Sequence, residues 1–403
     1  MTDTALPKPT MSPVERFSHA TGLDTRMLAM VAALILIWLI FYGLTDGIFL
    51  TARNLYNLAV QSSVVGIIAT GMVLVIVARH IDLSVGSALG FTGMLIAYWQ
   101  VEVGIAWPIA LLMGLVVGGL IGVWQGYWIA FQGVPAFVVT LGGLLIFRGG
   151  AFLVTDGKTV APMEPAYQLL GGGVDGSIGA TASWILGLVA VAAVVLITYR
   201  RRAQAKKYGF PVRSMAIEIA LLIVWAILIL GFVQIMNSYY KPRTEIPRGI
   251  PIPVLIMIAV VIVMTFLSRR TKFGRYVFAM GGNPEAAELS GINVKRTTMM
   301  IFVIIGILCA IAGVITSARL NAGTNSMGTL AELNVIAASV IGGTSLAGGI
   351  GTVPGAILGA VIMQSLENGM VLLGVSSAMR QVIIGLVLIA AVFFDVFYNK
   401  RRL

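Results

Sequence analysis

A short polar run, "ARHIDLSVGS", is the first place where side chains of this sequence could do chemistry. Arg79, Asp82 and Ser84 interrupt residues that are otherwise almost continuously apolar. Asp82 could pair with Arg79, or Asp82 and Ser84 could cap a helix that begins near Val85 by accepting its free backbone N–H groups. The spacing favours the capping role.

A cation lies inside an apolar segment in "VPAFVVTLGGLLIFRGG". Pro135 begins this segment, and Arg148 lies about 5 Å beyond its midpoint at a rise of ~1.5 Å per residue. A cation at that depth costs about 2.5 to 3.5 kcal/mol on insertion scales, so Arg148 must face a partner or an aqueous cavity. The sequence leaves two roles open, a structural ion pair and a position in a transport pathway.

A glycine-rich run, "AELNVIAASVIGGTSLAGGIGTVPG", begins at residue 331 and contains two glycine pairs that argue against one straight helix. Non-helical backbone at membrane depth occurs only where protein or a water-filled cavity satisfies its polar groups. The segment is therefore either a structural re-entrant turn or part of a polar route near Glu332, Asn334, Thr344 and Ser345.

A second short run, "NPEAAELSG" at 283–291, has the end signals of a helix that is too short to cross a membrane. Asn283 is a suitable N-cap, Pro284 occupies the first position, glutamate follows in the first turn and Gly291 ends the run. A surface helix flanked by basic residues suits docking to a soluble partner, although a loop helix can also be inert.

Motifs for other chemistry are absent from the sequence. "DGKT" has Phe152 where a phosphate-binding loop needs its leading glycine, and no HExxH, GxSxG or paired-carboxylate site occurs. The single cysteine, Cys309, cannot form an intramolecular disulfide or a metal cluster, and the two histidines, His19 and His80, do not suit a bis-histidine haem. We expect no enzyme activity, no cofactor and no bound metal, which argues against an integral membrane enzyme.

The elements that position these residues are membrane helices. The 403 residues are 58% hydrophobic and only 11% charged, whereas soluble domains carry about 25% charged residues. The net charge of +11 comes from cations in short connections between apolar segments, as the positive-inside rule predicts, and no basic stripe with interleaved aromatics indicates nucleic-acid binding.

Apolar segments recur from end to end and predict an all-α polytopic membrane protein with about twelve transmembrane or partly re-entrant helices. The first segment is longer than a signal-peptide core and lacks an A-x-A cleavage site, so we interpret it as an uncleaved span. The expected segments are 27–44, 55–78, 84–100, 104–131, 134–155, 184–199, 217–236, 252–267, 299–318, 333–350, 353–373 and 381–397.

Charge provides an independent test of this count. The prediction is a cytoplasmic segment at 1–26, a transmembrane domain at 27–397 with a cytoplasmic loop at 268–298, and a cytoplasmic tail at 398–403. Twelve crossings return the main basic connections and the tail to the cytoplasm only if 333–350 is a full crossing.

Glycines recur every four residues in three of these segments, most clearly at Gly114, Gly118 and Gly122. On a helix this spacing forms a smooth stripe along which two backbones can approach closely. Close helix packing is the ordinary interpretation, and sliding between helices during transport is the alternative.

Several motifs together resemble a known family. Glu285, Ala286, Ala287 and Gly291 reproduce the E-A-A-x-x-x-G pattern of the membrane subunits of ABC importers, although "INVK" stands where those subunits have I-x-L-P. "IDLSVGS", "VPAFVVTLGGLLIFRG", "GRYVFAMGGNPEAAELSGINV" and "IAASVIGGTSLAGGIGTVPGAILGA" look like the ribose, xylose and arabinose permease family. The stretch 184–236, two added spans joined by a basic loop, resembles the longer xylose-type subunit.

The resemblance implies a permease subunit of an ATP-driven importer in the bacterial inner membrane, with both termini cytoplasmic. It implies a homodimer, surrounded by lipid, that receives a monosaccharide, here D-xylose, from a periplasmic binding protein while a separate ATPase subunit hydrolyses ATP. The implied coupling helix comprises Asn283, Pro284, Glu285, Ala286, Ala287 and Gly291. The expected pathway residues are Thr140, Arg148, Asn334 and Ser345, and the structural motif residues are Asp82, Ser84, Gly86, Pro135, Gly342, Gly343, Gly348 and Gly349.

A proton-coupled secondary sugar transporter with twelve spans is the alternative, because the segment count fits it. Such a carrier needs a titratable group near the membrane midplane, for which Glu367 is the chief candidate. In that case the short helix at 283–291 would have no role.

Overall fold

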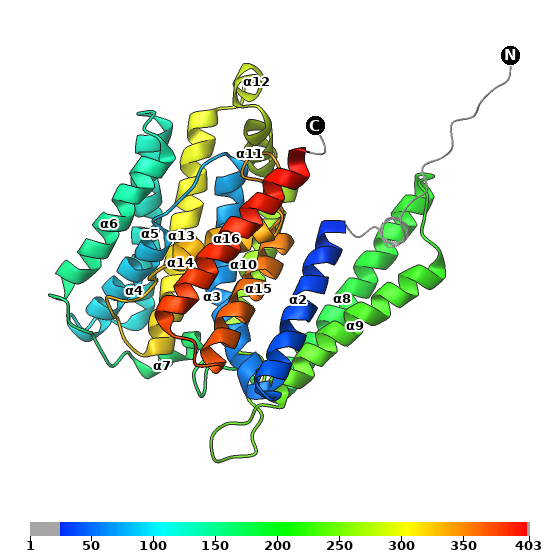
Figure 1. The fold of residues 1–403 in the computed structure, drawn as a ribbon, viewed down its shortest axis with the longest axis horizontal. Coiled ribbons are helices and arrows are strands. Elements are labelled where there is room, and N and C mark those ends of the chain that lie inside the picture. Colours follow the sequence, from blue (N-terminus) through cyan, green and yellow to red (C-terminus); the bar gives the residue numbers. More distant parts are fainter. Residues whose placement is uncertain (1–24, 401–403) are drawn as a thin grey trace.

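The computed structural model describes residues 25–400, which fold into helices with three isolated β-bridges and no β-strand (Figure 1). Within this range, nine helices are long and apolar enough to cross a membrane. They are α2 (Thr25–Leu44), α3 (Ala52–Val77), α5 (Trp107–Ala130), α6 (Ala136–Val154), α8 (Gly179–Lys207), α9 (Met215–Asn237), α10 (Ile252–Arg270), α13 (Val294–Leu320) and α15 (Val353–Leu372).

Three further helices have shorter apolar stretches: α4 (Val85–Val101), α14 (Ala331–Ile341) and α16 (Ser377–Lys400). Eleven of the expected apolar segments fall on one of these long or shorter helices, and 333–350 falls on α14 as far as Ile341, so the all-α prediction is confirmed for the described residues. The remaining elements are η1 (Ile48–Leu50), α7 (Pro165–Gln168), η2 (Leu169–Gly171), α11 (Lys272–Gly282) and α12 (Pro284–Leu289). Most of the predicted N-terminal segment 1–26, and the last three residues of the tail, lie outside the described residues.

The core forms around α3 and α13. The most apolar stretch of α3 is 89% buried and that of α13 is 67% buried, whereas the corresponding values for α2, α8 and α9 are 6%, 11% and 11%. The α8 and α9 helices lie side by side at one edge of the molecule, next to α2 (Figure 1). Most of the apolar side chains of α8 and α9 need a lipid environment, because no other described part of the chain covers them.

Glycines bring the α5 and α13 backbones together, which confirms the packing role predicted for this stripe. A Cβ atom on Gly118 would lie 2.5 Å from the Gly306 carbonyl oxygen, and one on Gly122 would overlap the Phe302 carbonyl oxygen. Only glycine permits this approach, because any larger side chain would separate the two helices.

The glycine-rich segment after α13 is not one straight helix, as its sequence predicted. The α14 helix ends at Ile341, and the turn that follows uses positive φ angles at Gly343, Gly348 and Gly349. A Cβ atom on Gly342 would lie 2.5 Å from the Gly355 carbonyl oxygen at the start of α15. The paired glycines therefore allow the chain to reverse tightly against α15.

Candidate functional site

The α12 helix is held in shape by local signals at both ends. The Asn283 side chain accepts a hydrogen bond from the Ala286 N–H group at 3.0 Å, and Pro284 occupies the first turn. At the other end, Gly291 has a φ of +82° and donates its N–H group to the Glu288 carbonyl. These caps compensate for the short length of α12, which would not be stable as an isolated helix.

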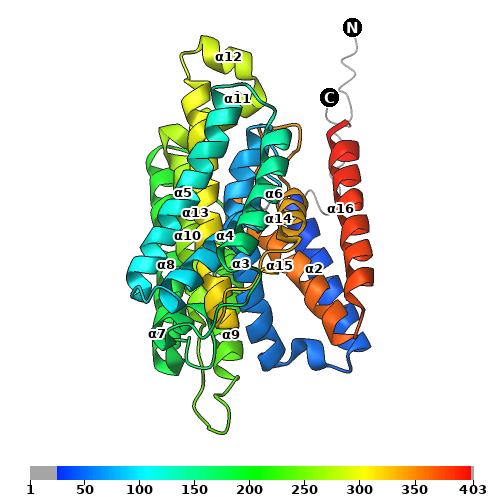
Figure 2. The same ribbon diagram turned by 90° about the vertical axis from the view of Figure 1, so that its left-hand side faces the viewer.

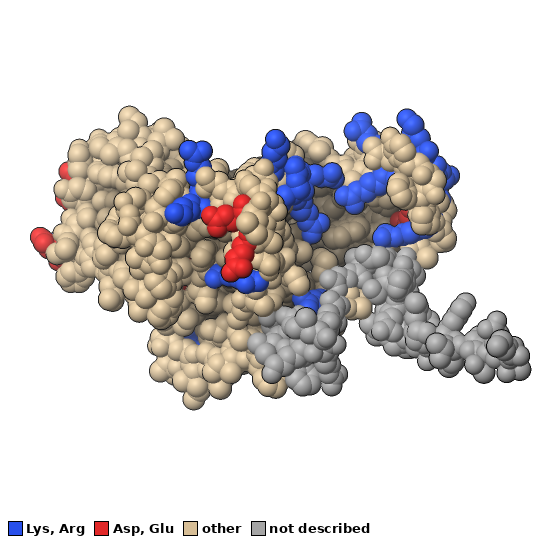
Figure 3. Space-filling view, turned by 90° about the horizontal axis from the view of Figure 1, so that it is seen from above, with Lys and Arg blue, Asp and Glu red and all other residues tan. Residues whose placement is uncertain are grey.

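Most of the α12 surface faces outward. Ala287 is the buried residue of this helix, while Leu289 is 90% exposed, the highest value among the large exposed apolar side chains. Asn283, Pro284, Glu285, Ala286 and Gly291 are exposed as well. The helix projects from one end of the molecule in both side views (Figures 1 and 2), and basic residues gather around acidic ones on this face (Figure 3).

The connection to α12 contains a helix that the sequence did not reveal. Between α10, which ends at Arg270, and α13, which begins at Val294, the chain forms α11 before α12. The prediction missed α11 because its glycines indicate a break. In the structure Gly281 belongs to the last turn of α11, where a Cβ atom would overlap the Val77 carbonyl oxygen.

Arg79, which follows α3, is hydrogen-bonded to the end of α11. Its side chain donates hydrogen bonds to the carbonyl oxygens of Gly281 at 2.7 Å and Gly282 at 2.6 Å. Gly349 donates its N–H group to the Val77 carbonyl at 2.9 Å, which brings the turn after α14 to the same place. Arg79 thus connects the end of α3 to the base of α12, so of the two roles that the sequence left open for Asp82, pairing with Arg79 is not the one formed.

Asp82 and Ser84 form a buried polar group before α4. One Asp82 oxygen accepts hydrogen bonds from the Ser84 N–H at 2.8 Å and the Ser84 hydroxyl at 2.7 Å. The Ser84 Oγ atom also accepts from the Gln125 side chain at 2.6 Å. The helix begins at Val85 as expected, but the prediction that the Ser84 side chain caps it is wrong, because that oxygen is directed to Asp82 and Gln125.

Arg148 holds the irregular segment between α13 and α14. One guanidinium nitrogen donates to the carbonyl oxygens of Asn325 at 3.1 Å and Met327 at 2.8 Å. No carboxylate of the described residues lies within 4.0 Å of this guanidinium, so the ion pair, one of the two roles that the sequence left open, is not formed. Gly90 on α4 makes room for this contact, because a Cβ atom there would lie 2.6 Å from the Met327 carbonyl oxygen.

Three buried oxygen atoms near the start of α14 have no hydrogen-bond partner among the described residues. They are the Oδ1 atoms of Asn325 and Asn334 and the Oε2 atom of Glu332. Glu332 lies against Gly86 of α4, where a Cβ atom would overlap this carboxylate oxygen. Such acceptors are costly to bury alone, so they mark a position where water or a hydroxyl-bearing ligand could donate hydrogen bonds.

Asn334 also contacts the residue that the secondary-transporter alternative required. Its Nδ2 atom donates to Glu367 Oε2 at 3.2 Å, and Gln364 donates to the same oxygen at 3.0 Å. The first bond joins α14 to α15, and the second lies within α15. Glu367 thus takes part in a contact between helices, which the sequence pattern could not show because Asn334 lies on a different helix, 33 residues away.

The other two expected pathway residues lie elsewhere and have their own partners. Thr140 is fully buried and donates to the Ala136 carbonyl at 2.9 Å and towards the Ile81 carbonyl at 3.2 Å. Ser345 is 1% exposed and lies in the turn after α14, where its hydroxyl accepts from the Ala347 N–H group. Pro135 directly precedes α6. The hydrogen bonds of the four expected pathway residues connect each of them to a different part of the chain.

Comparison with known proteins gives consistent matches along the chain. The family described as branched-chain amino acid transport system/permease component matches residues 54–392. The xylose transport system permease protein XylH of Escherichia coli K12 is 42% identical over 96% of this chain and 95% of the relative. The protein of that name from Haemophilus influenzae is 41% identical over 95% of this chain and 99% of the relative.

A ribose import permease protein, RbsC of Escherichia coli K12, is 33% identical over 88% of both chains. Identity and coverage are thus higher for the xylose-type relatives, which confirms the predicted resemblance to the xylose-type subunit. No solved structure matches the chain.

Proposed function

We propose that this chain, which belongs to the family of permease components of branched-chain amino acid transport systems, imports D-xylose as the membrane subunit of an ABC transporter. The family makes the chain a transport subunit that acts with an ATPase and a binding protein. The observation that carries the choice of sugar is the 42% identity to a xylose permease over nearly the full length of both proteins.

The α12 helix is proposed as the coupling helix that docks on the ATPase. Its caps give it a defined shape and its outer surface is free of contacts with the described body of the chain. Arg79 and the Gly281 contact would transmit a movement of α12 to α3 and to the turn before α15. ATP-driven closure of the ATPase subunits could then move these helices together.

A topology with twelve crossings and both termini in the cytoplasm is supported by the contacts around α14. The α13 helix begins beside α12, and its far end at Arg319 abuts Gly171. After α14, Gly349 is again hydrogen-bonded to the end of α3, beside the base of α12. The chain between α13 and α15 therefore returns across the molecule, as a full crossing of 333–350 requires.

The unpartnered oxygens of Asn325, Glu332 and Asn334 are proposed to line part of the sugar route. A pentose is uncharged and rich in hydroxyl donors, which match these acceptors. Arg148 supports the route by fixing the irregular segment that carries Asn325. A homodimer is proposed by analogy with the permease family, with the route completed by the second copy.

The experiment that tests this proposal is co-purification of the solubilised chain from its native membrane, followed by mass spectrometry and an ATPase assay. Recovery of an ATPase whose activity rises with xylose-loaded binding protein, and not with ribose-loaded protein, supports the proposal. Stimulation by ribose alone would contradict the choice of sugar, and recovery without any ATPase would contradict the docking role of α12.

A further inference from the structure

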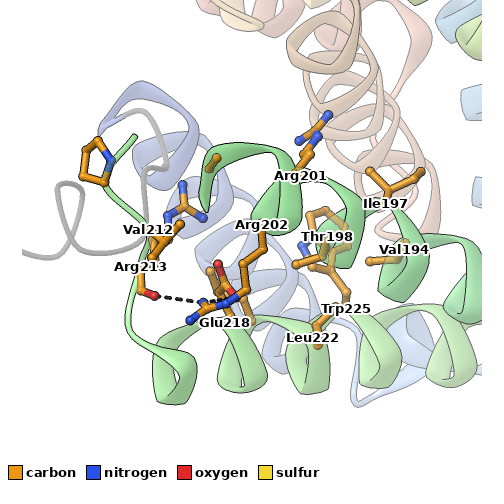
Figure 4. Close-up of a pocket in the computed structure, with 13 residues that line it drawn as sticks. Val194, Ile197, Thr198, Arg201, Arg202, Val212, Arg213, Glu218, Leu222 and Trp225 are labelled. Atoms are coloured by element: carbon orange, nitrogen blue, oxygen red, sulfur yellow. Dashed lines mark hydrogen bonds and ion pairs between the residues drawn. The ribbon is translucent and has the colours of Figure 1, made fainter. Parts of the chain in front are cut away.

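A pocket of about 410 Å³ lies between α8 and α9, outside the elements assigned to transport (Figure 4). Its apolar walls come from both helices and include Val194, Ile197, Leu221, Leu222 and Trp225. Trp225 is 48% exposed and Ile197 about half exposed, so the apolar wall is open to the surroundings of the helix pair. An apolar groove open at its side can accept a hydrocarbon chain.

The other end of the pocket is basic. Arg201, Arg202 and Arg213 line it, and Glu218 is its one acidic lining residue. The Arg202 guanidinium forms an ion pair with Glu218 and donates a hydrogen bond to the Arg213 carbonyl. No carboxylate of the described residues pairs with Arg201 or Arg213, so the pocket carries two cations without a counter-ion from that part of the chain.

The basic end lies at the height of lipid headgroups. The α8 helix has 29 residues and is therefore about 44 Å long, whereas the hydrocarbon layer is about 30 Å thick. About 20 residues from Gly179 fill that layer, which leaves Arg201 and the basic residues after it in the headgroup region. Basic side chains gather at this end of the molecule, on the same side as α12 (Figure 3).

We propose that this pocket binds one anionic glycerophospholipid. Its phosphate contacts Arg201 and Arg213, and one acyl chain runs along Leu222 and Trp225 between the two helices. The ion pair between Arg202 and Glu218 joins the ends of α8 and α9 beside these two cations. Charge complementarity selects an anionic lipid over a zwitterionic one, because no lining carboxylate is left to attract a choline group.

The inference does not depend on the transported sugar or on docking of α12. It requires only that α8 and α9 span the membrane, which their apolar composition and low burial support. A peptide segment of a partner protein could also enter an open groove. The apolar wall of the pocket lies within the hydrocarbon layer and its cationic end lies at the edge of that layer. This arrangement along the membrane normal matches a phospholipid, so it favours a lipid over a peptide.

Native mass spectrometry of the purified full-length chain tests the proposal. The chain in mild detergent is titrated with dioleoylphosphatidylglycerol and, separately, with dioleoylphosphatidylcholine, which has the same acyl chains and no net charge. The wild type is expected to bind the anionic lipid more tightly. The variant with both Arg201→Gln and Arg213→Gln should lose roughly thirtyfold in affinity, since each cation near an anionic headgroup contributes about fivefold.

Two further variants separate a built site from general surface charge. Arg200→Gln removes one charge from the same helix but not from the pocket lining, and should change the affinity little. Glu218→Gln releases Arg202 from its ion pair and should strengthen binding of the anionic lipid, a gain that misfolding cannot produce.

The result that would overturn the proposal is equal binding of the two lipids, or an equal loss in Arg200→Gln and the double variant. Displacement of the bound lipid by inorganic phosphate alone would show that the basic end of the pocket binds free phosphate, which would also overturn the proposal. Displacement by the purified ATPase subunit would assign the groove to a protein segment.

Discussion

Substitution of Leu289 provides the sharpest test of the proposed coupling helix. Leu289 is exposed on α12, and the hydrogen bonds that cap this helix come from residues within 283–291. Its side chain is 90% exposed, so nearly all of its apolar surface is available for burial by a partner. Leu289→Ala removes three carbon groups at about 0.8 kcal/mol each, which predicts a loss of about 2 kcal/mol in docking. This corresponds to a roughly thirtyfold weaker Kd for the ATPase.

The fold should not be affected by this change. Alanine is a strong helix former, and the caps at Asn283 and Gly291 remain intact. The measurement is the affinity of the solubilised permease for its purified ATPase by biolayer interferometry, with the thermal midpoint of the permease measured in parallel. Phe210→Ala is the matched control, because Phe210 is also apolar and 65% exposed, in the connection between α8 and α9.

The expected result is a higher Kd for the ATPase in Leu289→Ala, an unchanged Kd in Phe210→Ala and an unchanged thermal midpoint of unfolding in both variants. An unchanged Kd for Leu289→Ala would refute docking through the outer face of α12. An equal loss for both variants would indicate a broad apolar contact in place of a coupling helix.

The other predictions concern the residues that connect α12 and α14 to the body. Arg79→Ala removes two hydrogen bonds from a charged donor and should destabilise the chain by roughly 3 kcal/mol, with partial recovery in Arg79→Lys; equal midpoints in all three proteins would contradict the role of the guanidinium. Gly86→Ala forces a Cβ atom onto the Glu332 carboxylate and should abolish uptake, whereas Gly149→Ala on α6, with nothing within 4 Å, should not; equal uptake by both variants would refute the crowding argument. Glu332→Gln keeps the size and shape of the side chain but replaces one carboxylate acceptor with an NH₂ donor, so xylose uptake should fall at normal expression. Unchanged xylose uptake would exclude Glu332 from the proposed route.

Local signals in the sequence predicted much of what the structure contains. The caps of α12 depend on residues within nine positions of one another, so they were recognisable from Asn283 to Gly291. The glycine stripe on α5 indicated close packing for the same reason, because its spacing matches one face of a helix. Apolar length gave the positions of the membrane helices but not their ends, as α8 continues as a helix through its basic residues to Lys207.

Contacts between distant segments could not be predicted in this way. The partner of Arg79 is Gly281, 202 residues later, and nothing near Arg79 indicates that pairing. The same limit applies to Arg148, which contacts the Asn325 carbonyl 177 residues away in place of an acidic partner. The role of Gly281 is also a contact with a distant segment, because the lack of a side chain there lets α11 approach the end of α3.

The most direct test of the central claim is xylose uptake into proteoliposomes that contain this chain and its ATPase, with the binding protein supplied on the side opposite the ATPase. The proposal predicts xylose accumulation that requires ATP, the ATPase and the binding protein, and that persists when the proton gradient is dissipated. Uptake by the chain alone, driven by a proton gradient and independent of ATP, would contradict it.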